Sequence, residues 1–186
     1  MKTIILCGGL GTRLMEETVK IPKPLVKIGQ KPIVWHIIKL YQYYGFTNFI
    51  LAGGYKQNLL QNYFKKNPVH GCEIKVVNTG LGTLTGGRLL RLKKYFNKNE
   101  NFMMTYGDGL SNINIEKLVK FHLKHKKIAT MTAVRPPVRF GEIELNNNQV
   151  SSFKEKNQSS KNWINGGFFV LNYKIFNFIK NDKTIF

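Results

Sequence analysis

The segment LCGGLGTRLMEETVKIPKPLVKIG, residues 6–29, decides what kind of fold this chain builds. It overlaps the end of a short apolar run, TIILC at 3–7, which is typical of a strand buried on both faces of a parallel sheet. A glycine-rich turn directly after the first buried strand is the usual place of a phosphate loop in an open α/β sheet. The segment therefore predicts that an anionic ligand binds beyond the carboxyl end of this strand.

Two common phosphate loops fit the segment poorly. A Walker A loop ends in Gly-Lys-Ser/Thr, whereas Gly11 is followed here by Thr12 and Arg13. The dinucleotide fingerprint would place Leu14 at its third glycine, and the acidic ribose partner expected about 20 residues further on is missing from the basic stretch PKPLVKIG.

A third type of loop makes use of the cations. Gly8, Gly9 and Gly11 carry no Cβ, so backbone N–H groups can approach an oxyanion closely. Arg13 offers a rigid guanidinium fork to a phosphate. Lys23 stands between two prolines that restrict its backbone, which aims its ammonium group. The pattern indicates a phosphate site built from bare backbone and two fixed cations.

Strand-like and helix-like patterns alternate along the first two thirds of the chain. This alternation predicts an α/β fold, a Rossmann-like open and mostly parallel sheet with helices on both faces. Strands are expected at 3–7, 48–52, 73–77, 102–106 and 128–134, and helices at 32–45, 57–66, 86–96 and 113–127.

The character changes after residue 134. Short strands are expected at 142–145, 149–153 and 166–172, with a hairpin tip at 146–148. We expect a single domain over 1–186, with a nucleotide-binding core at 1–134 and a small β-rich extension at 135–186. The stretch 173–186 shows no clear closing element, and this part is expected to be C-terminally incomplete.

Composition narrows the class of protein. The chain has 186 residues, 42% of them apolar, and no stretch with the roughly 18 consecutive apolar residues of a spanning helix. Cys7 and Cys72 are too isolated for a disulfide framework, so a soluble cytoplasmic protein is expected. The net charge of +19 leaves a nucleic-acid binder open, but the lysines are scattered and no nucleic-acid-binding signature is present.

Longer strings carry a resemblance to a known family. LCGGLGTRL and PKPLVKIGQKPI resemble the signature of sugar-nucleotide pyrophosphorylases. Five further strings are similar to the glucose-1-phosphate cytidylyltransferase family in particular: KPIVWHIIKLYQYYG, TGGRL, TYGDGLSNINI, TAVRPPVRFG and WINGGFFVLN. The resemblance runs from Met1 to about Lys180; the first loop is shared with thymidylyl, uridylyl and guanylyl relatives, whereas the longer strings are specific.

The resemblance implies a reaction: CTP and α-D-glucose 1-phosphate give CDP-glucose and pyrophosphate, with Mg²⁺ as cofactor. A homo-oligomer that serves surface-polysaccharide synthesis would follow, with no nucleic-acid or membrane partner. Such a reaction needs in-line positioning and charge neutralisation rather than a strong base, because a sugar phosphate is already largely dianionic at neutral pH.

The resemblance also assigns roles to residues. Arg13, Lys23 and Asp108 would be catalytic, and Asp108 would hold the metal, since it follows a buried strand between two glycines. An Asp between glycines is also a common turn residue. Nucleotide contacts are expected from Leu6, Cys7, Gly8, Gly9, Leu10, Gly11, Thr12, Arg13, Lys23, Thr83, Arg88 and Gly107. Sugar-phosphate contacts are expected from Gly141, Glu155, Lys156, Asn165 and Gly166.

Three departures from the family keep alternatives open. The segment between Phe64 and Glu73 is shorter than in the family, and Asn157 replaces a proline. The family also continues beyond residue 186 into a second magnesium-binding aspartate, which Asp182 does not match. The alternatives are another sugar-1-phosphate nucleotidylyltransferase that uses dTTP, UTP or GTP, and a truncated, non-catalytic nucleotide-binding module.

One pair of histidines allows a metal site in principle. His122 and His125 lie one turn apart on the helix expected at 113–127. With no third ligand in view, we interpret them as part of a solvated face rather than as metal ligands.

Overall fold

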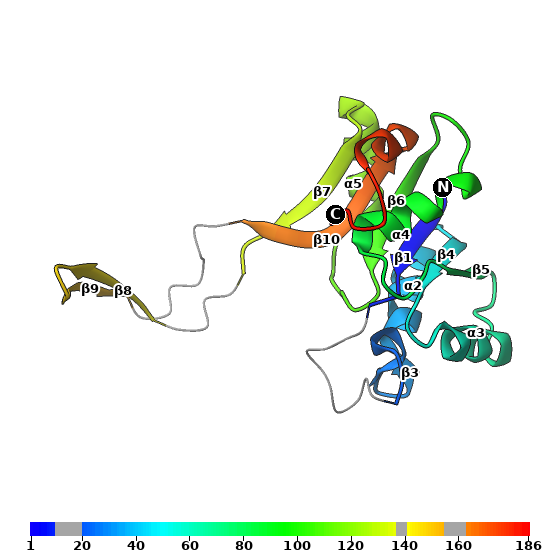
Figure 1. Ribbon diagram of the computed structural model, residues 1–186, viewed down its shortest axis with the longest axis horizontal. Coiled ribbons are helices and arrows are strands. Elements are labelled where there is room, and N and C mark those ends of the chain that lie inside the picture. The colour runs from blue at the N-terminus through cyan, green and yellow to red at the C-terminus, as the bar shows by residue number, and fades with distance from the viewer. Residues whose placement is uncertain (10–19, 137–140, 155–162) are drawn as a thin grey trace. The chain divides into compact units, whose positions relative to one another are not determined.

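A computed structural model describes residues 1–9, 20–136, 141–154 and 163–186, drawn in colour in Figure 1. The described chain divides into two compact units. The first comprises Met1–Thr130 together with Gly167–Phe186, and the second comprises Met131–Gly166.

The structure contains a six-stranded sheet with the strand order β5-β4-β1-β6-β10-β7. Strand β1 pairs in parallel with β4 on one side and β6 on the other, and β5 adds in parallel to β4. Strand β10 runs antiparallel to β6. The strands are β1 (Thr3–Leu6), β4 (Asn48–Gly53), β5 (Glu73–Asn78), β6 (Asn101–Tyr106), β7 (Ala129–Val134) and β10 (Ile164–Asn172).

Helices cover both faces of the sheet because its strands are apolar on both sides. Ile5 and Cys7 belong to one buried cluster, whereas Ile4 and Leu6 belong to the other. The first cluster packs under α2 (Ile33–Tyr43), α3 (Gln57–Lys66) and α5 (Ile115–His125), and the second under α4 (Thr85–Arg91), η3 (Lys93–Tyr95) and η4 (Tyr173–Phe178). The expected open, mostly parallel sheet is confirmed.

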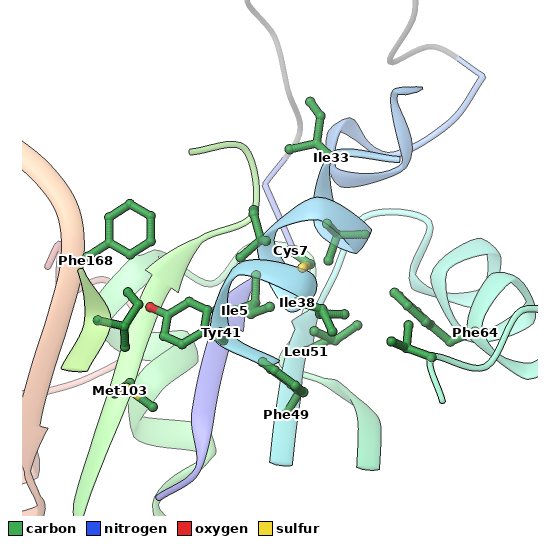
Figure 2. Close-up of a cluster of buried hydrophobic side chains, with 14 of the residues drawn as sticks. Ile5, Cys7, Ile33, Ile38, Tyr41, Phe49, Leu51, Phe64, Met103 and Phe168 are labelled. Carbon is green, nitrogen blue, oxygen red and sulfur yellow. The ribbon is translucent and has the colours of Figure 1, made fainter. Parts of the chain in front are cut away.

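Figure 2 shows the first cluster, in which side chains of α2 reach down onto the strands. Tyr41 and Phe49 are fully buried there, with ring centroids 6.3 Å apart. Burying such a side chain contributes about 1.5–3 kcal/mol. This core fixes the carboxyl end of β1, where the glycine-rich turn begins.

The expected boundaries of α2 are close to those observed. Pro32 precedes the first helical residue with φ −70°, and Gly45 follows the helix with φ +80°. Proline is preorganised for a helix start, and a positive φ favours glycine after a helix end. The proline and the glycine therefore mark the two ends of this helix.

The second unit contains a hairpin of β8 (Glu142–Asn146) and β9 (Gln149–Lys154). Its tip holds Asn147 and Asn148 at φ 47° and 67°, the left-handed backbone that asparagine tolerates in two-residue hairpin turns. The hairpin tip expected at 146–148 is confirmed.

A smaller hairpin, β2 (Lys27–Ile28) with β3 (Lys31–Pro32), follows the 3₁₀ turn η2 (Lys23–Leu25).

The stretch expected as one β-rich part from residue 135 is divided in the structure. Residues 131–166 form the second unit, but Gly167–Phe186 belong to the first. Phe168 and Val170 join one buried cluster, and Phe169 and Leu171 join the other. Because residues 168–171 of β10 are apolar on both sides, this part of the strand is buried in the main sheet rather than in a separate lobe.

The interpretation of His122 and His125 as a solvated face was wrong for His122, whose side chain is 2% exposed. Its Nδ1 lies 2.8 Å from Thr130 Oγ1, and His125 Nε2 lies 2.7 Å from the same oxygen. A helix-surface position became buried because the start of β7 packs against it.

Candidate nucleotide site

A pocket of about 430 Å³ opens at the carboxyl ends of β1 and β6. In open α/β sheets this position, where strand order reverses on either side of the first strand, is the usual ligand site. The pocket gathers residues from three loops and the start of α4: Leu6, Cys7, Gly8, Gly9, Lys23, Pro24, Thr83, Leu84, Thr85, Arg88, Tyr106, Gly107 and Asp108.

All eight described residues that were expected at the nucleotide therefore line one pocket. Pro24, Leu84, Thr85 and Tyr106 also line it but were not identified from the sequence. Tyr106 is the last residue of β6, directly before Gly107, so its place at the strand end is the sequence signal for its position at the pocket.

Backbone hydrogen bonds hold the turn after β1 against its neighbours. Cys7 N–H donates to Ala52 O at 3.0 Å, and Gly107 N–H donates to Leu6 O at 3.0 Å. A Cβ on Gly107 would lie 2.7 Å from Leu6 O, so no side chain fits where β1 and β6 end. Packing of the two strand ends thus requires this glycine.

Lys23 reaches across the pocket mouth to Asp108. Its ammonium forms an ion pair with Asp108 Oδ2. Pro22, at φ −67° and ψ 143°, and Pro24 hold Lys23 at the start of η2, as the flanking prolines predicted. The side chains of Lys23 and Asp108 are 26% and 38% exposed, so a ligand in the pocket can reach both charges.

Arg88 ties together the loops that form the pocket floor. Its Nη2 donates to Gly8 O at 2.8 Å, and its Nη1 donates to Gly80 O at 2.7 Å and to Thr79 Oγ1 at 2.9 Å. The residue is 4% exposed, and burial, followed by the nearby charge of Arg91, lowers the pKa of its guanidinium. Arg88 therefore shapes the glycine turn while adding positive charge beneath it.

Close approach explains the glycine at position 8. A Cβ there would lie 2.1 Å from Arg88 Nη1, a separation that cannot exist. By contrast, a Cβ on Gly9 would meet no described residue within 4 Å. The turn is thus packed against Arg88 at Gly8, and among the described residues nothing crowds Gly9.

Cys7 lines the pocket as a packed thiol. It is 2% exposed, and burial, reinforced by the charge of Asp108, raises the pKa of the thiol well above its ordinary value. A thiol that stays protonated is a poor nucleophile. Cys7 and Cys72 are both free cysteines.

Several expected site residues lie outside this pocket or outside the described residues. Gly141, Asn165 and Gly166 belong to the second unit. A Cβ on Gly166 would lie 2.9 Å from Val134 Cγ1, so close packing requires this glycine as well. Leu10, Gly11, Thr12, Arg13, Glu155 and Lys156 lie outside the described residues.

Within the described ranges, no group of three or more His, Cys, Asp or Glu side chains could hold a metal ion by itself. Asp182 pairs with Arg91 instead of joining Asp108. No helix in the same ranges is long and apolar enough to cross a bilayer.

An open α/β sheet with a lysine, a carboxylate and bare glycine backbone at its switch point defines a protein class that binds phosphorylated ligands. Comparison with known proteins then gives the family. Residues 2–185 match the nucleotidyl transferase family, and the chain belongs to it.

Two curated relatives show where the chain stands within this family. The chain is 42% identical to the glucose-1-phosphate cytidylyltransferase of Salmonella typhimurium, covering 99% of this chain and 80% of the relative. It is 43% identical to the probable glucose-1-phosphate cytidylyltransferase of Bacillus subtilis, over 100% of this chain and 81% of the relative. The resemblance seen in the sequence is thereby confirmed.

More distant relatives share the fold. The crystal structure of HddC from Yersinia pseudotuberculosis superposes with a TM-score of 0.79 at 26% identity, covering 100% of this chain and 82% of that one. The D-glycero-alpha-D-manno-heptose 1-phosphate guanylyltransferase of Aneurinibacillus thermoaerophilus is 35% identical over 95% of this chain and 76% of the relative.

Proposed function

We propose that the protein transfers a cytidylyl group from CTP to α-D-glucose 1-phosphate, which yields CDP-glucose and pyrophosphate. The observation that carries this proposal is one pocket that Lys23 and Asp108 line together with the glycine turn at Gly8 and Gly9. Relatives at 42–43% identity carry the names of this activity, which supports the choice of base and sugar.

In this proposal, a phosphate oxygen of the sugar attacks the α-phosphorus of CTP, and the bond to the β-phosphate oxygen breaks. The second pKa of a sugar phosphate is about 6, so no protein base has to remove a proton. The protein must align the two phosphates and offset their mutual repulsion. Lys23 supplies a cation on a restrained backbone, and the charge of Arg88 lies beneath the turn.

Asp108 would be the protein ligand of a magnesium ion that the substrate shares. Mg²⁺ usually takes one or two carboxylates, substrate phosphates and water, and Asp108 offers a partly exposed carboxylate at the pocket wall. When bound, the ion would neutralise charge that develops on the phosphates. With the substrate bound, the Lys23 ammonium would divide its contacts between Asp108 and phosphate oxygens.

A second candidate keeps the chemistry and changes the base. The guanylyltransferase relative is 35% identical, and HddC was crystallised as a complex with GMP-PN. The higher identity to cytidylyltransferases favours CTP. Homo-oligomerisation, a cytoplasmic location and a role in surface-polysaccharide synthesis belong to the same proposal.

The test measures pyrophosphate release with glucose 1-phosphate and each of CTP, dTTP, UTP and GTP, in the presence of Mg²⁺. CTP is expected to give the highest kcat/KM. Faster turnover with another nucleotide would replace the base assignment. Binding of CTP without turnover would select the non-catalytic module, and no binding of any nucleotide would overturn the proposal.

Lys23→Met tests the observation behind the proposal, with Lys27→Met as its matched control. Lys27 is an exposed lysine on β2, four residues further along. Removing a preorganised charge at the reacting phosphates costs roughly 100-fold or more in kcat/KM. Lys23→Met is expected to show that loss and Lys27→Met to stay near wild type.

A further inference from the structure

The segment Asn181–Phe186, here called the tail segment, binds the start of α4. Leu84 N–H donates to Asp182 O at 2.9 Å, and Gly86 N–H donates to Thr184 O at 3.0 Å. In the reverse direction, Phe186 N–H donates to Thr85 Oγ1 at 2.7 Å. The first turn of α4, which forms a wall of the pocket, is therefore bonded to the tail segment.

The two glycines of α4 form the seat for this segment. A Cβ on Gly86 would lie 2.9 Å from Thr184 O, and one on Gly87 would lie 2.5 Å from Asp182 O. No side chain fits at either position while the tail segment stays in place. The Gly-Gly pair of TGGRL thus serves packing against the tail segment.

Arg91 provides a second connection between α4 and the tail segment. Its Nε donates to Asp182 Oδ1 at 2.9 Å and its Nη2 contacts Oδ2, so the fork is bidentate. Its Nη1 donates to Thr79 O at 3.1 Å. These hydrogen bonds from Arg91 hold the pKa of the Asp182 carboxyl below its ordinary value.

The loop at Thr79 and Gly80 is consequently held from two sides. Arg88, which lines the pocket, bonds Thr79 Oγ1 and Gly80 O, and Arg91 bonds Thr79 O from the outer side. A Cβ on Gly80 would lie 2.4 Å from Arg91 Nη1, which shows how closely the second arginine approaches. Asp182 orients Arg91 and, through it, this loop.

We propose that Asp182 is a positioning residue for nucleotide binding: through Arg91 and the backbone of the tail segment it holds the loop after β5 and the start of α4. The proposal rests on the proposed function, because it assumes that the pocket binds a nucleotide. Both partners are nearly half exposed, so the ion pair itself adds little to global stability. The ion pair instead raises the fraction of molecules in which the pocket is preformed. The apparent affinity for the nucleotide is proportional to that fraction.

The test compares Asp182→Asn with Glu116→Gln in the full chain. Glu116 also forms an exposed pair, with Lys120 on α5, and lines no part of the pocket. Calorimetry with CTP gives the dissociation constant, steady-state kinetics give KM for each substrate, and thermal unfolding gives Tm. Asp182→Asn is expected to weaken CTP binding about 3- to 10-fold, with kcat, KM for glucose 1-phosphate and Tm close to those of Glu116→Gln.

A double-mutant cycle tests the route through Arg91. Arg91→Lys keeps the charge but loses the fork, so the double variant should bind CTP no more weakly than the weaker single variant. Additive losses would refute the route. The positioning role would be refuted if Asp182→Asn and Glu116→Gln bound CTP equally well, or if the loss of CTP affinity followed a fall in Tm. The proposed function would still stand in that case, provided that the wild type binds CTP. If wild type binds no CTP, both proposals fall.

Discussion

At the scale of single residues, Arg88 shows best how the chain builds its site. A buried guanidinium is costly unless its donors are satisfied. Here its nitrogens meet backbone carbonyls of Gly8, Gly53 and Gly80 rather than a carboxylate. The cation is thus kept without a neutralising partner among the described residues, directly beneath a turn suited to anions.

Arg88→Lys should destabilise the fold by about 2–4 kcal/mol, because one ammonium cannot serve carbonyls on three loops and leaves some unsatisfied. Urea denaturation measures the free energy of unfolding. Arg91→Lys, at an exposed position of the same helix, should cost far less. Equal losses in the two variants would contradict the role of Arg88 as a buried tie.

At the scale of elements, most helices and strands follow from local sequence. Strand β1, buried on both faces, is a continuous apolar run, and α2 starts and stops at a proline and a glycine. The place of β10 did not follow, because antiparallel insertion between β6 and β7 depends on contacts far apart along the chain. Local patterns carry no information on such pairing.

Helix α4 yields a prediction on its glycines. At a helix position with room for a side chain, Gly→Ala stabilises the folded protein by about 0.5–1 kcal/mol. At Gly87, however, the new Cβ would meet the backbone of Asp182. Gly87→Ala should therefore lower Tm and weaken CTP binding. Gly82→Ala, where a Cβ meets no described residue within 4 Å, should leave Tm unchanged. A stabilised Gly87→Ala would show that the tail segment does not occupy its seat.

The contact between α5 and β7 makes stability depend on pH. Burial, and then the charge of His125, lower the pKa of His122 below its ordinary value of 6.5. The unfolded chain therefore binds this proton at a higher pH than the folded chain does. The stabilisation is complete above about pH 6.5 and is lost as the pH falls through the window down to the folded pKa.

Urea denaturation from pH 7.5 to pH 5 measures this effect. His122→Gln should flatten the fall in unfolding free energy, by at most about 1.4 kcal/mol per pH unit. His70→Gln, at an exposed position, should follow the wild-type profile. Identical profiles for all three proteins would exclude His122 as the responsible group.

At the scale of the whole molecule, the formal charge of +19 acts together with a local site. Scattered surface lysines attract any polyanion, but exposed charges are screened over a Debye length of about 8 Å at physiological salt. A pocket with close phosphate contacts depends less on this general field. Salt dependence therefore separates a specific nucleotide site from a nucleic-acid surface.

Affinities for CTP and for duplex DNA should be compared at 50 and 200 mM salt. DNA binding through many lysine–phosphate contacts should fall roughly 1,000-fold or more, whereas CTP binding should fall roughly 10-fold or less. At 200 mM salt, CTP should retain its affinity when DNA is added. DNA affinity that withstands salt and excludes CTP would favour the nucleic-acid alternative.

The sequence by itself determined the alternation of strands and helices, the glycine turn after the first strand, and the position of Asp108 at the carboxyl edge of the sheet. These features follow from local burial patterns and from the shared edge at which parallel strands end. The place of Lys23 beside Asp108 was implied by the family resemblance. Only the tertiary structure decided that β10 enters the main sheet, that His122 is buried, and that the tail segment seats on Gly86 and Gly87. Each of these depends on surfaces that meet only after distant segments pack, and no local pattern specifies them.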